Sequence, residues 1–500
     1  MHEKQSFWAR VGDLFTGSPE HVSAPVGQAI RVTERGVRLP LDAHTFEVTV
    51  GNRRLHVTPD LAVTGGDADR VHELLVFYPE RFYGMIGHFA RLAPGDTLDI
   101  NPGADGPERL FTSPSDALRS SIRFRHEGEN LVIKATPEPE CFVMTVDDGA
   151  TGNRILAERQ RALLRIGDFF AEALDSLAPE AALDLLSNVN RVMEKESYRA
   201  EASDGQAGGI VELPDHKTPI VIGDLHGRVD NLLTLLCQND FLRSLEEGRA
   251  ALVILGDAVH PEGPDALDDM ESSVLTMDLI FRLKFTFPDG VFFLLGNHDS
   301  FSAELMKNGV PQGMLWERHL TRVRGEAYRD EMRRFYSLCP LMLVSDDLVA
   351  CHAGAPRVAV TRQMIVDVRQ HPTLLYELTW NRQMTRGHAG GYTGGDIRRL
   401  FQVLGIADDS TLVVGHYPRS ESGSVWLNAG GIAKHHVLVS SRPNQAALLT
   451  RVEGQIVAQT FASERLVTWL NQEMADRRGP TAAADMPRPA AARHVVHDQR

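Results

Sequence analysis

The stretch Pro219-Ile-Val-Ile-Gly-Asp-Leu-His-Gly-Arg228 decides the fold that the sequence predicts. Its apolar residues 220–222 end abruptly at a Gly-Asp-X-His-Gly motif, which is typical of a buried strand that breaks into a tight loop. The loop carries Asp224 and His226, two residues apart. Because a carboxylate and an imidazole at the same strand end can bind the same ion, the stretch favours a metal site.

The same pattern of an apolar run and a polar end recurs four times downstream. The runs are 251–255, 291–295, 348–351 and 411–414, and they lead into Gly256-Asp257, Gly296-Asn297-His298-Asp299, His352-Ala-Gly354 and Gly415-His416. Ligands of an open α/β sheet gather at the carboxyl ends of its strands. One such junction alone is typical of an ordinary turn or a hydrogen-bonded core histidine. Five junctions in order favour a two-metal site.

This ordered set of motifs resembles the metallophosphoesterases, and more narrowly the phosphoprotein phosphatase group. That group includes serine/threonine phosphatases and bacterial dinucleoside tetraphosphatases. The resemblance extends from about Leu213 to Gln459. It implies an α/β fold in which a layered, calcineurin-like metallophosphoesterase β-sandwich is flanked by helices.

The resemblance also implies a role for each motif residue. His298 would be the general acid. Asp224 and His226 would bind the first metal ion, Asp257 would bridge both ions, and Asn297, His352 and His416 would bind the second.

The chemistry of phosphoester hydrolysis is consistent with these residue types. Two metal ions about 3.5–4 Å apart can hold a hydroxide between them as the nucleophile and neutralise the phosphoryl oxygens. Oxygen and nitrogen ligands without thiolate suit manganese, our first expectation, or iron or zinc. An imidazole such as His298 can give the leaving group a proton near neutral pH. The anionic ester also needs cationic donors, and arginine suits that purpose best.

The segment after the second strand departs from the family pattern Gly-Asp-X-X-Asp-Arg-Gly. It reads Gly256-Asp-Ala-Val-His-Pro-Glu-Gly263. His260 stands where the aspartate that orients His298 belongs, so we count His260 among the catalytic candidates. Pro261 stands where a phosphate-binding arginine belongs, so another cation is needed.

Several arginines are candidates for that cation. Trp380-Asn-Arg382 resembles the Trp-X-Arg of bacterial phage-type phosphatases, which makes Arg382 the first candidate. Arg228, in the first metal loop, is the second candidate, and Arg386 and Arg442 follow. Each of them could equally be a solvated surface charge.

Composition limits the class of protein. A chain of 500 residues predicts two or three domains with a sizeable core. The formal charge of −15, without a basic stripe interleaved with aromatic residues, argues against nucleic acid as a partner. The four scattered cysteines favour reduced thiols and a cytoplasmic protein. The sequence contains no apolar run of about 18 residues, so no membrane-spanning helix is predicted.

The chain divides into five predicted segments. Residues 1–22 form a short amphipathic segment, and 25–150 form a β-rich domain, a sandwich or small barrel. Part of that domain, 92–100, faintly resembles a strand of the phosphothreonine-binding forkhead-associated domains. Residues 154–198 form a helical connector, which a flexible link at 201–209 joins to a catalytic domain at 210–465. Residues 475–500 form a disordered tail.

Within the catalytic domain, helical stretches are expected between the strands. They are 229–247, 268–285, 302–307, 313–335 and 394–404.

The most specific function that the sequence supports is a serine/threonine protein phosphatase. The preferred substrate is then a phosphoprotein, by analogy with the resembled group. Hydrolysis of dinucleoside polyphosphates or other small phosphoesters is the alternative within the same chemistry. A non-catalytic, phospho-dependent binding or scaffold protein is the alternative of another class, in which the β-rich domain would bind a protein partner.

Overall fold

The computed structural model describes residues 19–478 with gaps. The gaps are 22–26, 41–44, 51–52, 60–73, 78–80, 83–84, 87–88, 93, 101–120, 137–140, 147–149, 171–172, 239, 264–265, 386–389, 421–422, 444 and 453. The predicted amphipathic segment at 1–22 lies outside the described residues as far as residue 18. The predicted tail lies outside them from residue 479.

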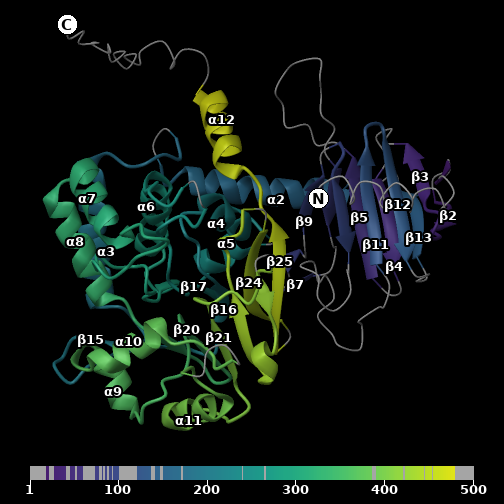
Figure 1. The fold of residues 1–500 in the computed structure, drawn as a ribbon. Helices are drawn as coiled ribbons and strands as arrows, with labels where there is room; N and C mark the ends of the chain where they lie inside the picture. The colour runs from purple at the N-terminus through teal and green to yellow at the C-terminus, as the bar shows by residue number, and fades with distance from the viewer. Residues whose placement is uncertain are drawn as a thin grey trace, which may run out of the picture.

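Two β-sheets form the centre of the C-terminal part of the chain (Figure 1). One sheet has the order β18 (Val291–Phe293), β17 (Ala250–Ile254), β16 (Thr218–Ile222), β24 (Gln445–Val452) and β25 (Gln455–Ala462). The other has the order β14 (Arg199–Glu201), β15 (Ala207–Glu212), β19 (Met342–Val344), β20 (Leu348–Cys351), β21 (Thr411–Val414), β23 (His435–Leu438) and β22 (Val425–Trp426). β16, β17 and β18 are parallel neighbours, and so are β20 and β21.

The strands are apolar throughout because each has two buried faces. In β17, Leu252 and Ile254 pack in the core beneath the helices, whereas Ala251 and Val253 pack against the other sheet. The same alternation divides the other central strands between an outer core and the core between the sheets. Continuous apolar runs are what strands buried on both faces require.

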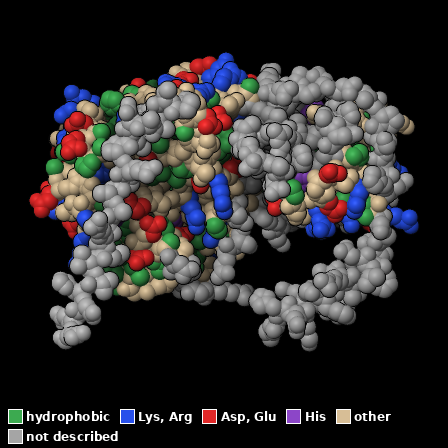
Figure 2. All heavy atoms as spheres, turned by 90° about the horizontal axis from the view of Figure 1, so that it is seen from above, with side chains coloured by type: hydrophobic (Ala, Val, Ile, Leu, Met, Phe, Trp, Pro, Cys, Tyr) green, Lys and Arg blue, Asp and Glu red, His purple; other side chains and the backbone are tan. Residues whose placement is uncertain are grey.

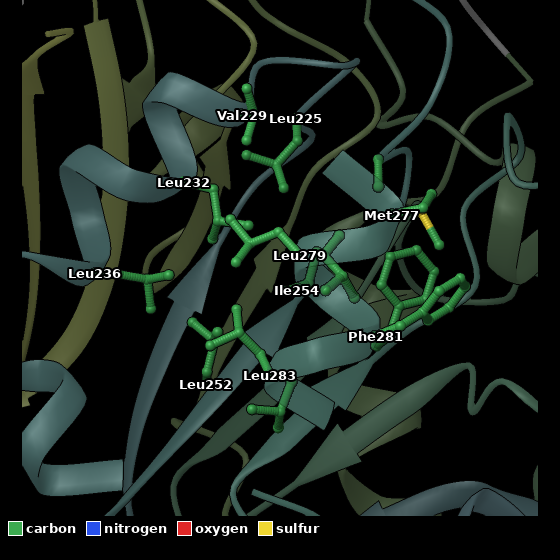
Figure 3. Packing of buried hydrophobic residues seen from close by; sticks show 14 of the residues in the cluster. Leu225, Val229, Leu232, Leu236, Leu252, Ile254, Met277, Leu279, Phe281 and Leu283 are labelled. Carbon is green, nitrogen blue, oxygen red and sulfur yellow. The ribbon is translucent and has the colours of Figure 1, made fainter. Parts of the chain in front are cut away.

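Helices cover the outer face of each sheet. Those packed on the first sheet include α4 (Val229–Leu236), α5 (Phe241–Glu246), α6 (Glu271–Thr286), α7 (Gln312–Arg324) and α8 (Glu326–Leu338). Those packed on the second are α9 (Arg362–Val366), α10 (Pro372–Trp380) and α11 (Gly394–Leu404). Figure 3 shows leucines of α4 and α6 meeting over β17. The predicted layered α/β fold is therefore confirmed.

The N-terminal region is β-rich, as predicted, and consists mainly of two sheets. One is formed by β1 (Glu20–His21), β3 (Val37–Pro40), β12 (Asn130–Thr136), β11 (Ser121–Glu127) and β10 (Thr97–Ile100). The other is formed by β2 (Ala29–Arg31), β13 (Cys141–Val146), β4 (Thr45–Val50), β5 (Arg53–Pro59), β6 (Leu74–Phe77) and β9 (Phe89–Leu92). The short strands β7 (Arg81–Phe82) and β8 (Met85–Ile86) pair separately.

Side chains of both N-terminal sheets share one hydrophobic core, so the two sheets pack face to face as a sandwich. The forkhead-associated resemblance of 92–100 stays a prediction. Two helices follow, α2 (Ala150–Gly167) and α3 (Pro179–Glu194). In Figure 1, α2 runs from the helices of the C-terminal part toward the sandwich.

Three local expectations were wrong. The predicted flexible link at 201–209 is the tip of a hairpin: β14 ends at Glu201, β15 begins at Ala207, and the two strands pair. The predicted helix at 302–307 is not helical: residues 303–304 form a turn, and Lys307 forms an isolated bridge with Val310. The predicted tail begins within α12 (Leu466–Arg478), whose last residues are still helical.

The surface carries both signs of charge. Acidic and basic side chains are interspersed over the face seen in Figure 2. Among the described helices, none has both the length and the apolar character needed to cross a membrane.

Helix α6 offers a direct test of the packing. Phe281 is 1% exposed in the core, whereas Phe285, one turn later, is 48% exposed. We expect Phe281→Ala to lower the free energy of unfolding by about 3–5 kcal/mol, because it leaves a cavity among close-packed side chains. Phe285→Ala, the matched control, should change it by less than about 1 kcal/mol. Urea unfolding followed by circular dichroism measures both, and equal effects would contradict the packing described here.

Candidate metal centre

Five strand ends from the two sheets converge on one pocket. β16, β17 and β18 lead to Asp224 and His226, to Asp257 and to Asn297, whereas β20 and β21 lead to His352 and His416. Two groups have ligand atoms within 4.8 Å of one another: Asp224, His226 and Asp257 form one, and Asp257, His352 and His416 form the other. Asp257 belongs to both groups.

The remaining predicted ligand, Asn297, lies with them. Its Oδ1 is 2.9 Å from Nε2 of His352, and its side chain lines the same pocket. The structure thus brings all six predicted ligands together, although their metal-binding roles remain predictions.

Hydrogen bonds orient the imidazoles toward the shared carboxylate. Nδ1 of His226 lies 3.0 Å from the carbonyl oxygen of Val259, and Nδ1 of His352 lies 2.8 Å from that of Leu255. A ring that donates from Nδ1 to a carbonyl keeps the lone pair of Nε2 for a metal ion. Nε2 of His352 lies 3.4 Å from Oδ2 of Asp257. Nε2 of His226 lies 3.9 Å from the same oxygen and 3.5 Å from Oε1 of Glu262.

The ligand loops have an unusual backbone conformation. His226, Asp257 and His416 have φ values of 45°, 50° and 62°, and His260 has 68°. Side-chain-bearing residues seldom adopt this left-handed region, and its concentration in one place is typical of functional sites. Hydrogen bonds between the loops hold it, since the amides of Leu225 and His226 both donate to the Asp257 carbonyl.

Asp299 links the loops that follow β17 and β18 through hydrogen bonds to their backbone amides. Its carboxylate accepts hydrogen bonds from the amides of Asp257, at 2.7 Å, and of Gly296, at 2.9 Å. The amide of Ala258 is a third donor, at 3.3 Å. The sequence places Asp299 in the Gly296-Asn297-His298-Asp299 junction, but no role was predicted for it. Its position directly after Asn297 and His298 was the sequence feature that could have indicated a role at the site.

The electrostatics of the pocket suit cations. Burial raises the pKa of Asp224 to about 8, and it raises that of Asp257 well above its usual value, with a further contribution from Asp299. Burial also lowers the pKa of His226, which favours the neutral, ligating form. Divalent ions would stabilise the ionised carboxylates and accept the neutral imidazoles. The oxygen and nitrogen donors therefore fit the ions predicted from the sequence.

His298 and His260 lie one behind the other. His298 lines the pocket, its ring 4.9 Å from that of His226. His260 lies deeper, fully buried, with its ring 5.6 Å from that of His298. Within the described structure, neither ring nitrogen of His260, nor Nδ1 of His298, makes a hydrogen bond of normal geometry. Burial lowers the pKa of His260 to about 3, so its imidazole is neutral. Neither protonation state of an imidazole carries the negative charge of the aspartate that stands at this position in the family pattern.

The predicted arginines differ in position. Arg382 lines the pocket, with its Nε 3.5 Å from Nε2 of His416 and its guanidinium 4.7 Å from the ring centre of Tyr417. Arg228 precedes α4 and is not among the described residues that line the pocket. Arg442 donates to backbone carbonyls of Gly423 and Ser420. Arg386 lies outside the described residues.

Two charged residues of the pocket were missed from the sequence, Glu262 and Lys307. Glu262 is the penultimate residue of the segment 256–263 that departs from the family pattern, and that departure was the sequence feature that could have indicated it. Lys307 lies in the stretch expected to be helical.

Converging strand ends, a carboxylate common to two groups of possible ligands and buried imidazoles are features of a metal-dependent hydrolase site. Residues 218–439 match the family model of the calcineurin-like phosphoesterases. This part of the chain is therefore a calcineurin-like phosphoesterase domain, and the chemistry of that family is metal-dependent hydrolysis of phosphoesters.

Solved structures of phosphatases also resemble the chain. A protein serine/threonine phosphatase from Saccharomyces cerevisiae, described as similar to human phosphatase PP5, is 14% identical with a TM-score of 0.44, covering 58% of this chain and 91% of that one. A cold-active protein-tyrosine phosphatase of a psychrophile Shewanella species is 15% identical with a TM-score of 0.34, covering 51% and 82%. No curated protein matches the chain.

The close approach of two loops provides a test of the site. A Cβ atom added at Gly296 would lie 2.2 Å from Oδ1 of Asp257 and 2.5 Å from its amide nitrogen. We therefore expect Gly296→Ala to displace the shared carboxylate and weaken Mn²⁺ binding by at least about tenfold, or 1.4 kcal/mol. Isothermal titration calorimetry on metal-free protein measures this.

Gly263→Ala is the matched control. The nearest atom to a Cβ there is the Cβ of Ala266 at 3.7 Å, an ordinary contact in the same loop as Asp257. Wild-type Mn²⁺ affinity in a folded Gly296→Ala protein would show that the two loops do not form the binding site.

Proposed function

We propose that this protein is a serine/threonine protein phosphatase of the phosphoprotein phosphatase type, which hydrolyses phosphomonoesters with two divalent metal ions. The observation that carries the proposal is the membership of Asp257 in both groups of clustered ligand atoms. A carboxylate shared in this way is what a two-metal site requires.

The ligands divide between two ions, for which we propose manganese first and iron or zinc as alternatives. Asp224 and His226 would hold one ion and Asn297, His352 and His416 the other, with Asp257 between them. When bound, the ions supply Lewis-acid neutralisation of the phosphoryl oxygens and lower the pKa of the attacking water.

Side chains of the protein would bind the phosphoryl group and protonate the leaving group. Arg382 would bind the phosphoryl oxygens, and the ring of Tyr417 supports its guanidinium. We assign the general-acid role to His298, which lines the pocket. Burial, together with the charges of His226 and His260, lowers the pKa of His298 well below its usual value. A bound phosphoryl dianion beside the ring would act in the opposite direction and favour the protonated imidazole.

The dimensions of the pocket support a phosphorylated side chain as substrate. Its volume of about 260 Å³ accommodates a phosphoryl group and a short stem. A dinucleoside polyphosphate would extend beyond it. Exposed apolar side chains at the pocket, Met306 and Tyr417, could contact the rest of a peptide.

Hydrolysis of an aryl phosphate tests the chemistry. We expect turnover by the full-length protein with Mn²⁺, loss of turnover after chelation and recovery when Mn²⁺ is restored. His298→Ala should lower kcat by about 100-fold or more, which is the usual contribution of a general acid. His216→Ala, at an exposed histidine outside the pocket, is the control. Folded, metal-loaded protein without turnover would favour the non-catalytic alternative, in which the N-terminal sandwich binds a phosphorylated partner.

A comparison of substrates tests the narrower proposal. We expect kcat/KM to be at least about tenfold higher, or 1.4 kcal/mol in transition-state free energy, for a phosphothreonine peptide than for diadenosine tetraphosphate. Phosphate release measured under identical Mn²⁺ conditions gives both values. The reverse order would replace the protein phosphatase with a dinucleoside polyphosphate hydrolase.

A further inference from the structure

An ion pair lies at the pocket beside the segment that departs from the family pattern. The ammonium group of Lys307 pairs with the carboxylate of Glu262, and both residues line the pocket together with Asp257 and His298. The two side chains are 30% and 31% exposed, so the pair faces the pocket and is reachable by a ligand.

The backbone fixes the position of Lys307. The amide of each of Lys307 and Val310 donates to the carbonyl of the other, at 3.0 Å and 2.9 Å. Between them, Asn308 and Gly309 both have positive φ, 50° and 81°, as in the tight two-residue hairpin turn that favours Asn-Gly. The preceding Leu305 is 1% exposed. The lysine is therefore presented by an anchored turn.

Glu262 holds the ammonium without using all of its donors. Its Oε1 pairs with Lys307 and lies 3.5 Å from Nε2 of His226, and its Oε2 accepts a hydrogen bond from the Ser441 hydroxyl at 3.2 Å. An ammonium has three N–H donors, so two are left for a further acceptor in the pocket.

We propose that Lys307 binds the phosphoryl oxygens of the substrate, together with Arg382, and supplies the cation that Pro261 cannot. The inference rests on the proposed function, because it concerns the substrate of the same site. Lysine suits such a place because it acts as a compact point charge on a long stem, without the fixed fork of arginine.

Inorganic phosphate is the probe for this inference. Isothermal titration calorimetry on full-length, Mn²⁺-loaded protein gives the Kd for phosphate, and metal analysis confirms equal loading. We expect Lys307→Met to raise this Kd at least about tenfold, as loss of a charge-assisted hydrogen bond predicts, and Lys307→Arg to raise it much less. Lys434→Met removes a lysine that pairs with Asp409 at 3.1 Å outside the pocket, and it should leave the Kd unchanged.

A double variant separates direct contact from a general charge effect. Lys307→Met alone leaves Glu262 without its partner, and that carboxylate could repel phosphate. Lys307→Met combined with Glu262→Gln removes both charges, so the net charge equals that of the wild type. Weak phosphate binding by this double variant supports direct contact by Lys307. Recovery of the wild-type Kd would overturn the inference, as would an unchanged Kd in Lys307→Met.

The outcomes also separate this inference from the proposed function. If wild type and Lys307→Met both turn over aryl phosphate, with equal KM and equal Kd for phosphate, then Lys307 has no role in phosphate binding. The proposed phosphatase activity would still stand. If phosphate binding depends on Lys307 but no phosphoester is turned over, the anion-binding role of Lys307 would be supported and the proposed phosphatase function would be wrong.

Discussion

Buried carboxylates are the constraint on which the centre of this structure depends. Asp224, Asp257 and Asp299 are each 2% exposed or less where the strand ends of two sheets meet. An ionised carboxylate is costly to bury unless hydrogen bonds and opposite charges replace its water. Asp299 receives three backbone amides. Asp224 and Asp257 receive the amides of His416 and His298 and otherwise face the pocket, where bound cations would complete their surroundings.

The same constraint explains the shape of the loops. Backbone amides can reach a buried carboxylate only where the chain turns sharply, and the left-handed residues His226, Asp257 and His416 provide such turns. Each costs of the order of 1–3 kcal/mol, which the surrounding hydrogen bonds must offset. Glycine is needed where two loops touch, because a Cβ at Gly256 would lie 2.4 Å from the amide nitrogen of Gly296. This strain is concentrated at the site, where four of the eight described non-glycine residues with positive φ lie.

The sequence allowed the layered fold and the convergence of the strand ends to be predicted, because both follow from local patterns. An apolar run that ends in Gly-Asp or Gly-His specifies a strand and its polar end without knowledge of any distant contact. The pairing of Lys307 with Glu262 joins residues 45 positions apart, and no local pattern indicates it. The prediction of a helix at 302–307 was wrong because it did not take account of Asn308 and Gly309. These two residues form a tight turn that reverses the chain. The expected flexible link at 201–209 was wrong because Gly208 and Gly209 pack closely in strand β15 of a hairpin.

Metal ligands and substrate cations are subject to different demands, and this difference explains how the motif can change while the fold stays. A ligand atom must lie within a few tenths of an ångström of its place, so ligands come from strand ends that the sheets hold rigidly. A lysine or arginine side chain reaches a phosphoryl oxygen on a long stem, so its backbone can lie at several places around the pocket. Pro261 provides no cation at the position of the family arginine, whereas Lys307 on a tight turn and Arg382 after α10 both line the same pocket. On the proposed assignment, Lys307 and Arg382 supply the charge that an anionic substrate requires, in place of an arginine within the motif.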